Sequence, residues 1–114
     1  WNMLHPQEKP RLSYVEECLT GVSGPVIAAT DYMKAYADQI REFVPGLYSV
    51  LGTDGFGRSD TRERLRKFFE VDRYYITVAA LSALAQKNVI DAAQVTKAIE
   101  LYGIDPGKPD PVTL

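Results

Sequence analysis

The sequence predicts an α/β fold in which a partial parallel sheet is flanked by helices. Two short apolar runs, residues 25–30 and 48–51, are bounded by Gly or Pro, as strands buried on both faces are. An amphipathic segment of helical period separates them, and strand, helix, strand is the crossover unit of a parallel sheet. The C-terminal half has helical periodicity and no further strand pattern.

Composition limits the class of protein. The 114 residues allow one domain, and a hydrophobic content of 46% permits a core. Lys and Arg number 13 against 15 Asp and Glu, a net charge of −2 that gives no general attraction to nucleic acid or an anionic membrane. A single cysteine, Cys18, excludes an internal disulfide framework. We expect a cytoplasmic protein with neither nucleic acid nor a membrane as partner.

The N-terminal third contains a connector and a short helix. Residues 1–12 hold two prolines and no apolar period, which predicts an extended connector. Residues 13–19 have the capping-box pattern, with Ser13 as N-cap and Glu16 three residues on. After the first strand, apolar residues at helical spacing predict one helix over 31–44, which Pro45 and Gly46 end.

Cap residues place the later helices. Ser59 or Asp60 can begin a helix, with Glu63 closing a box back onto Asp60. Asp72 can begin a second that ends near Asn88, and a third follows. That last helix has Asp91 as its cap, Gln94 three residues on and Gly103 just past its end. Residues 106–114 hold three prolines and predict an extended tail, docked or disordered.

The predicted domain, residues 13–105, is expected to be incomplete. Two strands that are apolar on both faces cannot form a stable sheet alone. We therefore expect further strands from chain outside this sequence or from a partner. The chain also starts with Trp1 rather than Met. The sequence thus predicts a fragment of a larger protein.

The glycine-rich loop 52–60 follows the second strand and precedes a helix. Backbone N–H groups at a helix N-terminus can hold a phosphate, but the spacing fits neither nucleotide-binding pattern. Asp54 and Asp60 would repel an anion, and a tight turn is the alternative interpretation. A calcium loop is disfavoured by Phe56 and Arg58 at ligand positions. The candidate anion or interface residues are Gly55, Gly57, Arg58 and Ser59.

A basic cluster follows the loop. Arg62 and Arg66 share one helical face, which is either solvated or contacts an acidic partner or a neighbouring domain. His5 is the single histidine and has no partner at metal-ligand or catalytic spacing. Cys18 is most simply a buried small apolar residue. No catalytic residue and no metal site is predicted.

Several stretches resemble one enzyme family. Residues 1–6, 30–33, 51–63, 69–72 and 78–81 are similar to the C-terminal region of the homodimeric bacterial type of pyruvate dehydrogenase (acetyl-transferring). The resemblance runs over nearly the whole chain, and the loop 52–60 is its most specific part.

The resemblance implies the fold, the reaction and the partners. It implies a transketolase C-terminal-like domain, the third of three α/β domains. The whole enzyme would use thiamine diphosphate and Mg²⁺ to decarboxylate pyruvate and reductively acetylate a lipoyl group. The implied partners are the other domains, a second subunit and the dihydrolipoamide acetyltransferase.

The resemblance places the cofactor between the first two domains, so no cofactor-binding residue is expected here. The family's cofactor motif starts G-D-G and ends in asparagine, whereas Thr53 precedes Asp54-Gly55 and the next asparagine is Asn88. The expected role is structural and dimer-stabilising. The alternative is a regulatory module that binds a phosphate or nucleotide through the loop 52–60.

Overall fold

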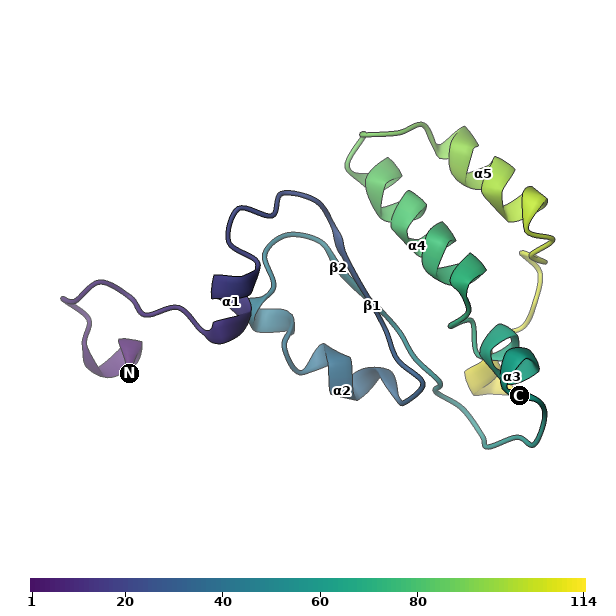
Figure 1. Ribbon diagram of the computed structural model, residues 1–114, viewed down its shortest axis with the longest axis horizontal. Helices are drawn as coiled ribbons and strands as arrows, with labels where there is room; N and C mark the ends of the chain where they lie inside the picture. The colour runs from purple at the N-terminus through teal and green to yellow at the C-terminus, as the bar shows by residue number, and fades with distance from the viewer.

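A two-stranded parallel sheet forms the centre of the chain, as the sequence predicts. The computed structural model describes residues 1–114. Strand β1 (Val26–Ala29) pairs in parallel with β2 (Tyr48–Leu51), with Val26 opposite Tyr48 and Ala29 opposite Leu51. Helix α2 (Lys34–Asp38) packs on β2, and α4 (Arg73–Gln86) packs on both strands from the other side (Figure 1). Helix α5 (Ala92–Leu101) packs on α4, on the side away from the sheet.

Helix α1 (Tyr14–Cys18) is confirmed together with its capping box. The Glu16 amide donates to Ser13 Oγ at 3.3 Å, and the Ser13 amide donates to Glu16 Oε2 at 2.7 Å. That second bond, from a backbone N–H to the charged carboxylate, is the main cause that lowers the pKa of Glu16. The box therefore fixes where the chain turns from the connector into the helix.

The single helix predicted over 31–44 is wrong. The segment forms α2 (Lys34–Asp38) and, separately, a 3-10 turn η2 (Arg41–Phe43). In a continuous helix the Ala37 carbonyl would accept from the Arg41 amide. Here that carbonyl accepts from the Tyr48 hydroxyl at 2.6 Å, while the Arg41 side chain donates to the Tyr48 carbonyl at 2.8 Å. Hydrogen bonds to strand β2 thus replace those that would continue the helix.

The C-terminal helices follow the predicted order. They are α3 (Arg62–Phe68), α4 (Arg73–Gln86) and α5 (Ala92–Leu101). Asp72 and Asp91 cap α4 and α5 as predicted, and both Asn88 (φ 58°) and Gly103 (φ 62°) take the left-handed conformation past the helix ends.

The predicted cap of α3 is wrong. The N-cap is Thr61, not Ser59 or Asp60, and its hydroxyl accepts from the Arg64 amide at 3.4 Å. The Asp60 carboxylate instead accepts from the Thr61 amide at 2.7 Å. That local bond keeps Asp60 one residue outside the helix, so Glu63 cannot close a box with it.

Both terminal segments contain short turns that the sequence pattern does not indicate. Residues 1–12, expected to be an extended connector, include a 3-10 turn η1 (Asn2–Leu4). The Asn2 side chain bonds both backbone groups of Arg11 at 2.9 Å, which closes this segment into a loop. The tail ends in a 3-10 turn η3 (Pro111–Thr113), and Pro111 is buried. Lys108 fastens the tail to α3 by donating to the Phe68 carbonyl at 2.9 Å.

The core is thin for a chain of this length. Only 7 of 114 residues are buried, and the apolar ones are Val44, Tyr48, Val71, Ala83 and Ala98. The sequence predicts strands buried on both faces, yet only Tyr48 among their residues is buried. With two strands and one helix on each side, much of the sheet stays uncovered. The radius of gyration is 17.3 Å, against about 13 Å for a compact domain of about 100 residues.

None of the helices combines the length and the apolar character that crossing a membrane requires.

Candidate functional site

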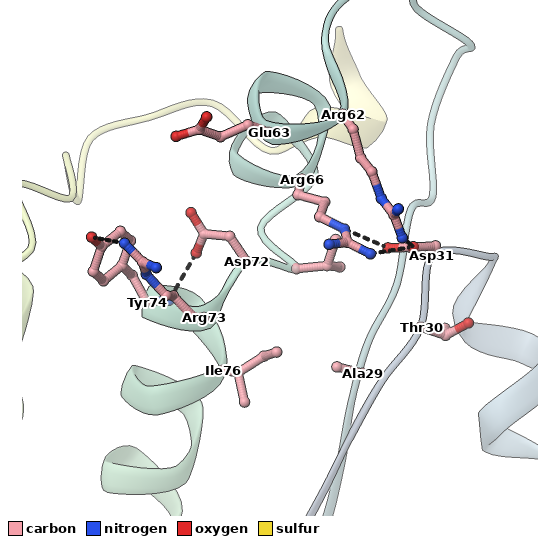
Figure 2. Close-up of a pocket in the computed structure, with 11 residues that line it drawn as sticks. Ala29, Thr30, Asp31, Arg62, Glu63, Arg66, Asp72, Arg73, Tyr74 and Ile76 are labelled. Atoms are coloured by element: carbon pink, nitrogen blue, oxygen red, sulfur yellow. Dashed lines mark hydrogen bonds and ion pairs between the residues drawn. The ribbon is translucent and has the colours of Figure 1, made fainter.

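A groove of about 820 Å³ lies at the carboxyl end of β1. It is lined by the end of β1 and the residues after it, by α3, and by the start of α4 (Figure 2). We call it the β1–α3–α4 groove. Its lining residues are Ala29, Thr30, Asp31, Arg62, Glu63, Arg66, Val71, Asp72, Arg73, Tyr74 and Ile76.

Asp31 is the centre of the charged side of this groove. Arg66 donates to it through both Nε (3.1 Å) and Nη2 (2.7 Å), a bidentate pair. Arg62 Nη2 lies 3.6 Å from Asp31 Oδ2. The hydrogen bonds from Arg66 hold the pKa of Asp31 below its usual value, and the same pair raises the pKa of Arg66. Arg62 and Arg66 do share a face, and both turn toward this carboxylate (Figure 2).

The start of α4 forms the opposite side of the groove. Arg73 Nη2 donates to the Tyr74 hydroxyl at 2.8 Å, and this bond is the main cause that raises the pKa of Arg73. The Asp72 carboxylate is used within the chain, because it accepts from the Tyr74 and Tyr75 amides at 3.0 Å each.

The four candidate residues of the loop 52–60 do not line this groove. At Gly55, which has φ +128°, an ideal Cβ would stand 2.8 Å from the Pro111 carbonyl oxygen. Gly57 faces open space. The Arg58 guanidinium stacks over the Phe68 ring, 4.1 Å from its centroid. Ser59 is exposed and caps no helix. This arrangement favours the tight-turn interpretation of the loop.

The beginning of the loop is held against the segment after β1. The Thr53 amide donates to the Tyr32 carbonyl at 2.8 Å, and Asp54 Oδ2 accepts from the Lys34 amide at 3.2 Å. A Cβ on Gly52 would stand 2.7 Å from that same Lys34 amide nitrogen. Asp54 therefore provides the hydrogen-bond acceptor for a backbone amide at the start of α2.

The residues of this chain do not fit a thiamine diphosphate and Mg²⁺ site. No three or more His, Cys, Asp or Glu side chains gather in a way that could hold a metal ion. Asp54, one of the two acidic residues of the loop, accepts a hydrogen bond from the Lys34 amide. His5 stacks on Trp1, with 4.1 Å between ring centroids. Cys18, expected to be buried, is exposed because α1 buries none of its residues.

Two residues that matter in this geometry carry no local signal in the sequence. Asp31 lies 35 positions from Arg66, and Tyr48 lies 11 positions from the Ala37 carbonyl that its hydroxyl contacts. The first partnership depends on how the segments after the two strands come together, and the second depends on how α2 packs on β2. Only a predicted register could have placed Asp31 near α3.

Comparison with known proteins gives consistent results. Residues 1–72 match the model of the transketolase-like TK C-terminal domain family. The chain is 62% identical to a pyruvate dehydrogenase E1 component of Pseudomonas aeruginosa over 98% of its length, and 59% identical to one of Cupriavidus necator over 100%. Identity to the Escherichia coli protein of that name is 52% over 97% of the chain.

The chain spans only a small part of these relatives. It covers 13% of the proteins from Pseudomonas aeruginosa and Cupriavidus necator and 12% of the Escherichia coli protein. The family model covers more than half of the chain. The chain therefore belongs to the transketolase-like C-terminal domain family.

Proposed function

We propose that this chain is the C-terminal structural and assembly domain of a pyruvate dehydrogenase E1 component. The whole enzyme would decarboxylate pyruvate on thiamine diphosphate and reductively acetylate a lipoyl group of its dihydrolipoamide acetyltransferase partner. Identity of 52–62% over nearly the whole chain to proteins of that name supports this assignment.

The observation that carries the assembly role is the thin core. With 7 buried residues among 114, the chain buries little apolar surface of its own. Large apolar side chains stay exposed on the segment that contains α2 and η2: Tyr32, Met33, Tyr36, Ile40 and Phe43. A domain with such a surface gains stability by packing on other domains or on a second subunit.

The cofactor enters this proposal only through the rest of the enzyme. The side chains present here lack a metal-ligand cluster, and we propose that thiamine diphosphate and Mg²⁺ are held by other domains in the cytoplasmic enzyme. The contribution of this chain is to hold those domains in place.

A complementation experiment tests the proposal. The parent enzyme is truncated just before Trp1, and its pyruvate decarboxylation and its mass in solution are measured with thiamine diphosphate and Mg²⁺. We expect loss of activity and of the dimer, with recovery when this chain is added and no turnover by the chain alone. A truncated enzyme that is dimeric and fully active would overturn the assembly role.

A further inference from the structure

Three helices of the chain end in the same backbone arrangement, and one of them has an unusual residue there. The residue that follows the C-cap of α3, α4 and α5 has a positive φ: Glu70 (62°), Asn88 (58°) and Gly103 (62°). At each end the amide of the next residue donates to the carbonyl five positions back, at 2.9–3.1 Å. Glycine is the ordinary residue at this position, and asparagine is the usual second choice. A glutamate there is strained, because its Cβ disfavours a positive φ.

The Glu70 side chain holds Lys108 of the C-terminal tail, which returns to the end of α3 (Figure 1). Lys108 Nζ lies 2.9 Å from Glu70 Oε1 and also donates to the Phe68 carbonyl at 2.9 Å. With side chains 23% and 38% exposed, this is the least exposed ion pair of the chain. Such a pair is screened less by solvent than one at the surface. The strained helix end therefore carries the carboxylate that fastens the tail.

The tail and the glycine-rich loop meet at two aromatic rings, those of Phe68 and Phe69, which we call the aromatic pair. The rings stack edge-on, with 4.9 Å between their centroids. The Lys108 ammonium of the tail lies 5.2 Å from the Phe68 centroid, and the Arg58 guanidinium of the loop lies 4.1 Å from it. Both segments thus place a cation against the same ring.

The loop depends on such contacts for its position. No backbone group of residues 54–60 makes a hydrogen bond with another backbone group. Gly55 lies against the tail, since a Cβ on it would stand 2.8 Å from the Pro111 carbonyl oxygen and 3.6 Å from the Phe69 ring. A segment without backbone hydrogen bonds is the first to move when its packing contacts are lost. Displacing the tail should therefore release the loop as well.

We propose that residues 106–114 form a strap that opens and closes over the aromatic pair, with Glu70 as its latch. In the closed strap Glu70 holds Lys108, and the Pro111 backbone keeps Gly55 and its loop in place. When the strap opens, the loop is released and both rings lose their cover. This device is independent of the assembly role, because every contact in it lies within this chain.

Replacing Glu70 by glycine separates the latch from the backbone. Glu70→Gly relieves the strained φ, so a residue that only ends α3 could be replaced without loosening any neighbour. For a latch, we expect the amides of residues 108–114 to exchange about threefold faster in the full-length enzyme, the loss typical of one partly exposed ion pair. Asn88→Gly is the matched control, because exposed Asn88 ends α4 in the same way. Exchange over residues 84–90 should there be unchanged or slower.

Cleavage by trypsin after Arg58 reports on the loop. Because the Arg58 guanidinium is held on the Phe68 ring, a protease reaches this bond when the loop is released. Lys108→Met removes both hydrogen bonds of the latch, and we expect cleavage of the full-length enzyme at this bond to be at least about fivefold faster. Lys97→Met, at an exposed lysine of α5, should leave the rate unchanged. If Lys108→Met does not yield folded enzyme, Glu70→Gly is digested instead, with an expected increase of about threefold.

Two results would overturn the proposal. Tail exchange in Glu70→Gly that is no faster than in wild type would mean that Glu70 only ends α3. Cleavage after Arg58 at the wild-type rate in Lys108→Met, or in Glu70→Gly where that variant replaces it, would mean that the tail does not hold the loop.

Discussion

The carbonyl oxygen of Pro111 lies 2.8 Å from the point where a Cβ atom on Gly55 would stand. The glycine-rich loop and the C-terminal tail, more than fifty residues apart in the sequence, therefore touch at this position. Gly55 also has φ +128°, a conformation that residues with a side chain rarely adopt. The contact explains why a side chain is excluded at Gly55, and it gives the tail a fixed place.

Gly55→Ala should destabilise the loop and release the tail. Both the close approach to the Pro111 backbone and the strained φ oppose a Cβ, at a cost of about 1–3 kcal/mol. Gly57→Ala is the control, because nothing lies within 4 Å of its Cβ position. Amide exchange of residues 52–57 and 108–114 in the parent enzyme would measure this. Equal exchange in the two variants would contradict the role of the Gly55 contact.

Sequence patterns predict those parts of the fold and of the site that are determined by residues close together in the chain. The capping box of Ser13 and Glu16 and the caps Asp72 and Asp91 are local patterns, and the structure confirms them. The parallel pairing of the strands follows from their apolar composition and the connection between them. The family resemblance identified the domain type, which the match over residues 1–72 confirms.

The failed predictions each involve a competing contact that no local pattern contains. The apolar spacing of residues 31–44 fits one helix. In the structure, however, the Ala37 carbonyl accepts a hydrogen bond from the Tyr48 hydroxyl instead of from the Arg41 amide. The sequence does not indicate the groove, because Asp31 and Arg66 lie 35 positions apart and meet only in the folded chain. Gly57 looks equivalent to Gly55 in the sequence, but in the structure Gly55 alone of the two has a positive φ and lies against the tail.

Because Thr61 is the N-cap of α3, replacing it should destabilise this helix more than replacing Ser59 does. Thr61→Ala removes the acceptor of the Arg64 amide and should destabilise α3 by about 0.5–1 kcal/mol, toward the lower end for a cap because the bond is 3.4 Å long. Ser59→Ala should leave α3 unchanged. Amide hydrogen exchange of residues 62–68 would compare the two variants. Faster exchange in Ser59→Ala than in Thr61→Ala would show that Ser59, as the sequence predicts, is the N-cap.

Tyr48 should contribute to stability through its hydroxyl as well as its ring. It is 5% exposed, and burial raises its pKa, so the hydroxyl stays a donor at neutral pH. Tyr48→Phe leaves the Ala37 carbonyl without this donor, and we expect a loss of about 0.5–1.5 kcal/mol. Tyr36→Phe, at a side chain that is 59% exposed, is the control. Faster exchange over residues 34–43 in Tyr48→Phe alone is the expected result.

The Asp31–Arg66 pair predicts a pH dependence of defined sign. The pKa of folded Asp31 is lowered, first by its hydrogen bonds to Arg66, so its contribution is present above the ordinary carboxyl pKa of 3.8 and is lost as pH falls below that value. Asp31→Asn should therefore be less stable than wild type near pH 7, by less than about 1 kcal/mol for an exposed pair. The difference should shrink as the pH falls below 3.8 and vanish below the lowered pKa of folded Asp31.

Thermal unfolding of the parent enzyme at several pH values would measure this difference. Glu8→Gln is the control, since the Glu8 carboxylate takes part in no ion pair or side-chain hydrogen bond. A difference between wild type and Asp31→Asn that persists unchanged at pH 3 would show that the charge on Asp31 is not its cause.

The isolated chain should not unfold as a cooperative monomer. Its buried apolar residues are few, and exposed ones such as Tyr14 (80%), Met3 (85%) and Leu101 (80%) lie on separate elements. A two-stranded sheet with one helix on either side lacks the burial that offsets the loss of chain entropy. We expect a broad thermal transition, dye binding to exposed apolar surface, and self-association in sedimentation. A monomeric chain with one sharp calorimetric transition would contradict this, because it would mean that the contacts described here suffice for an independent fold.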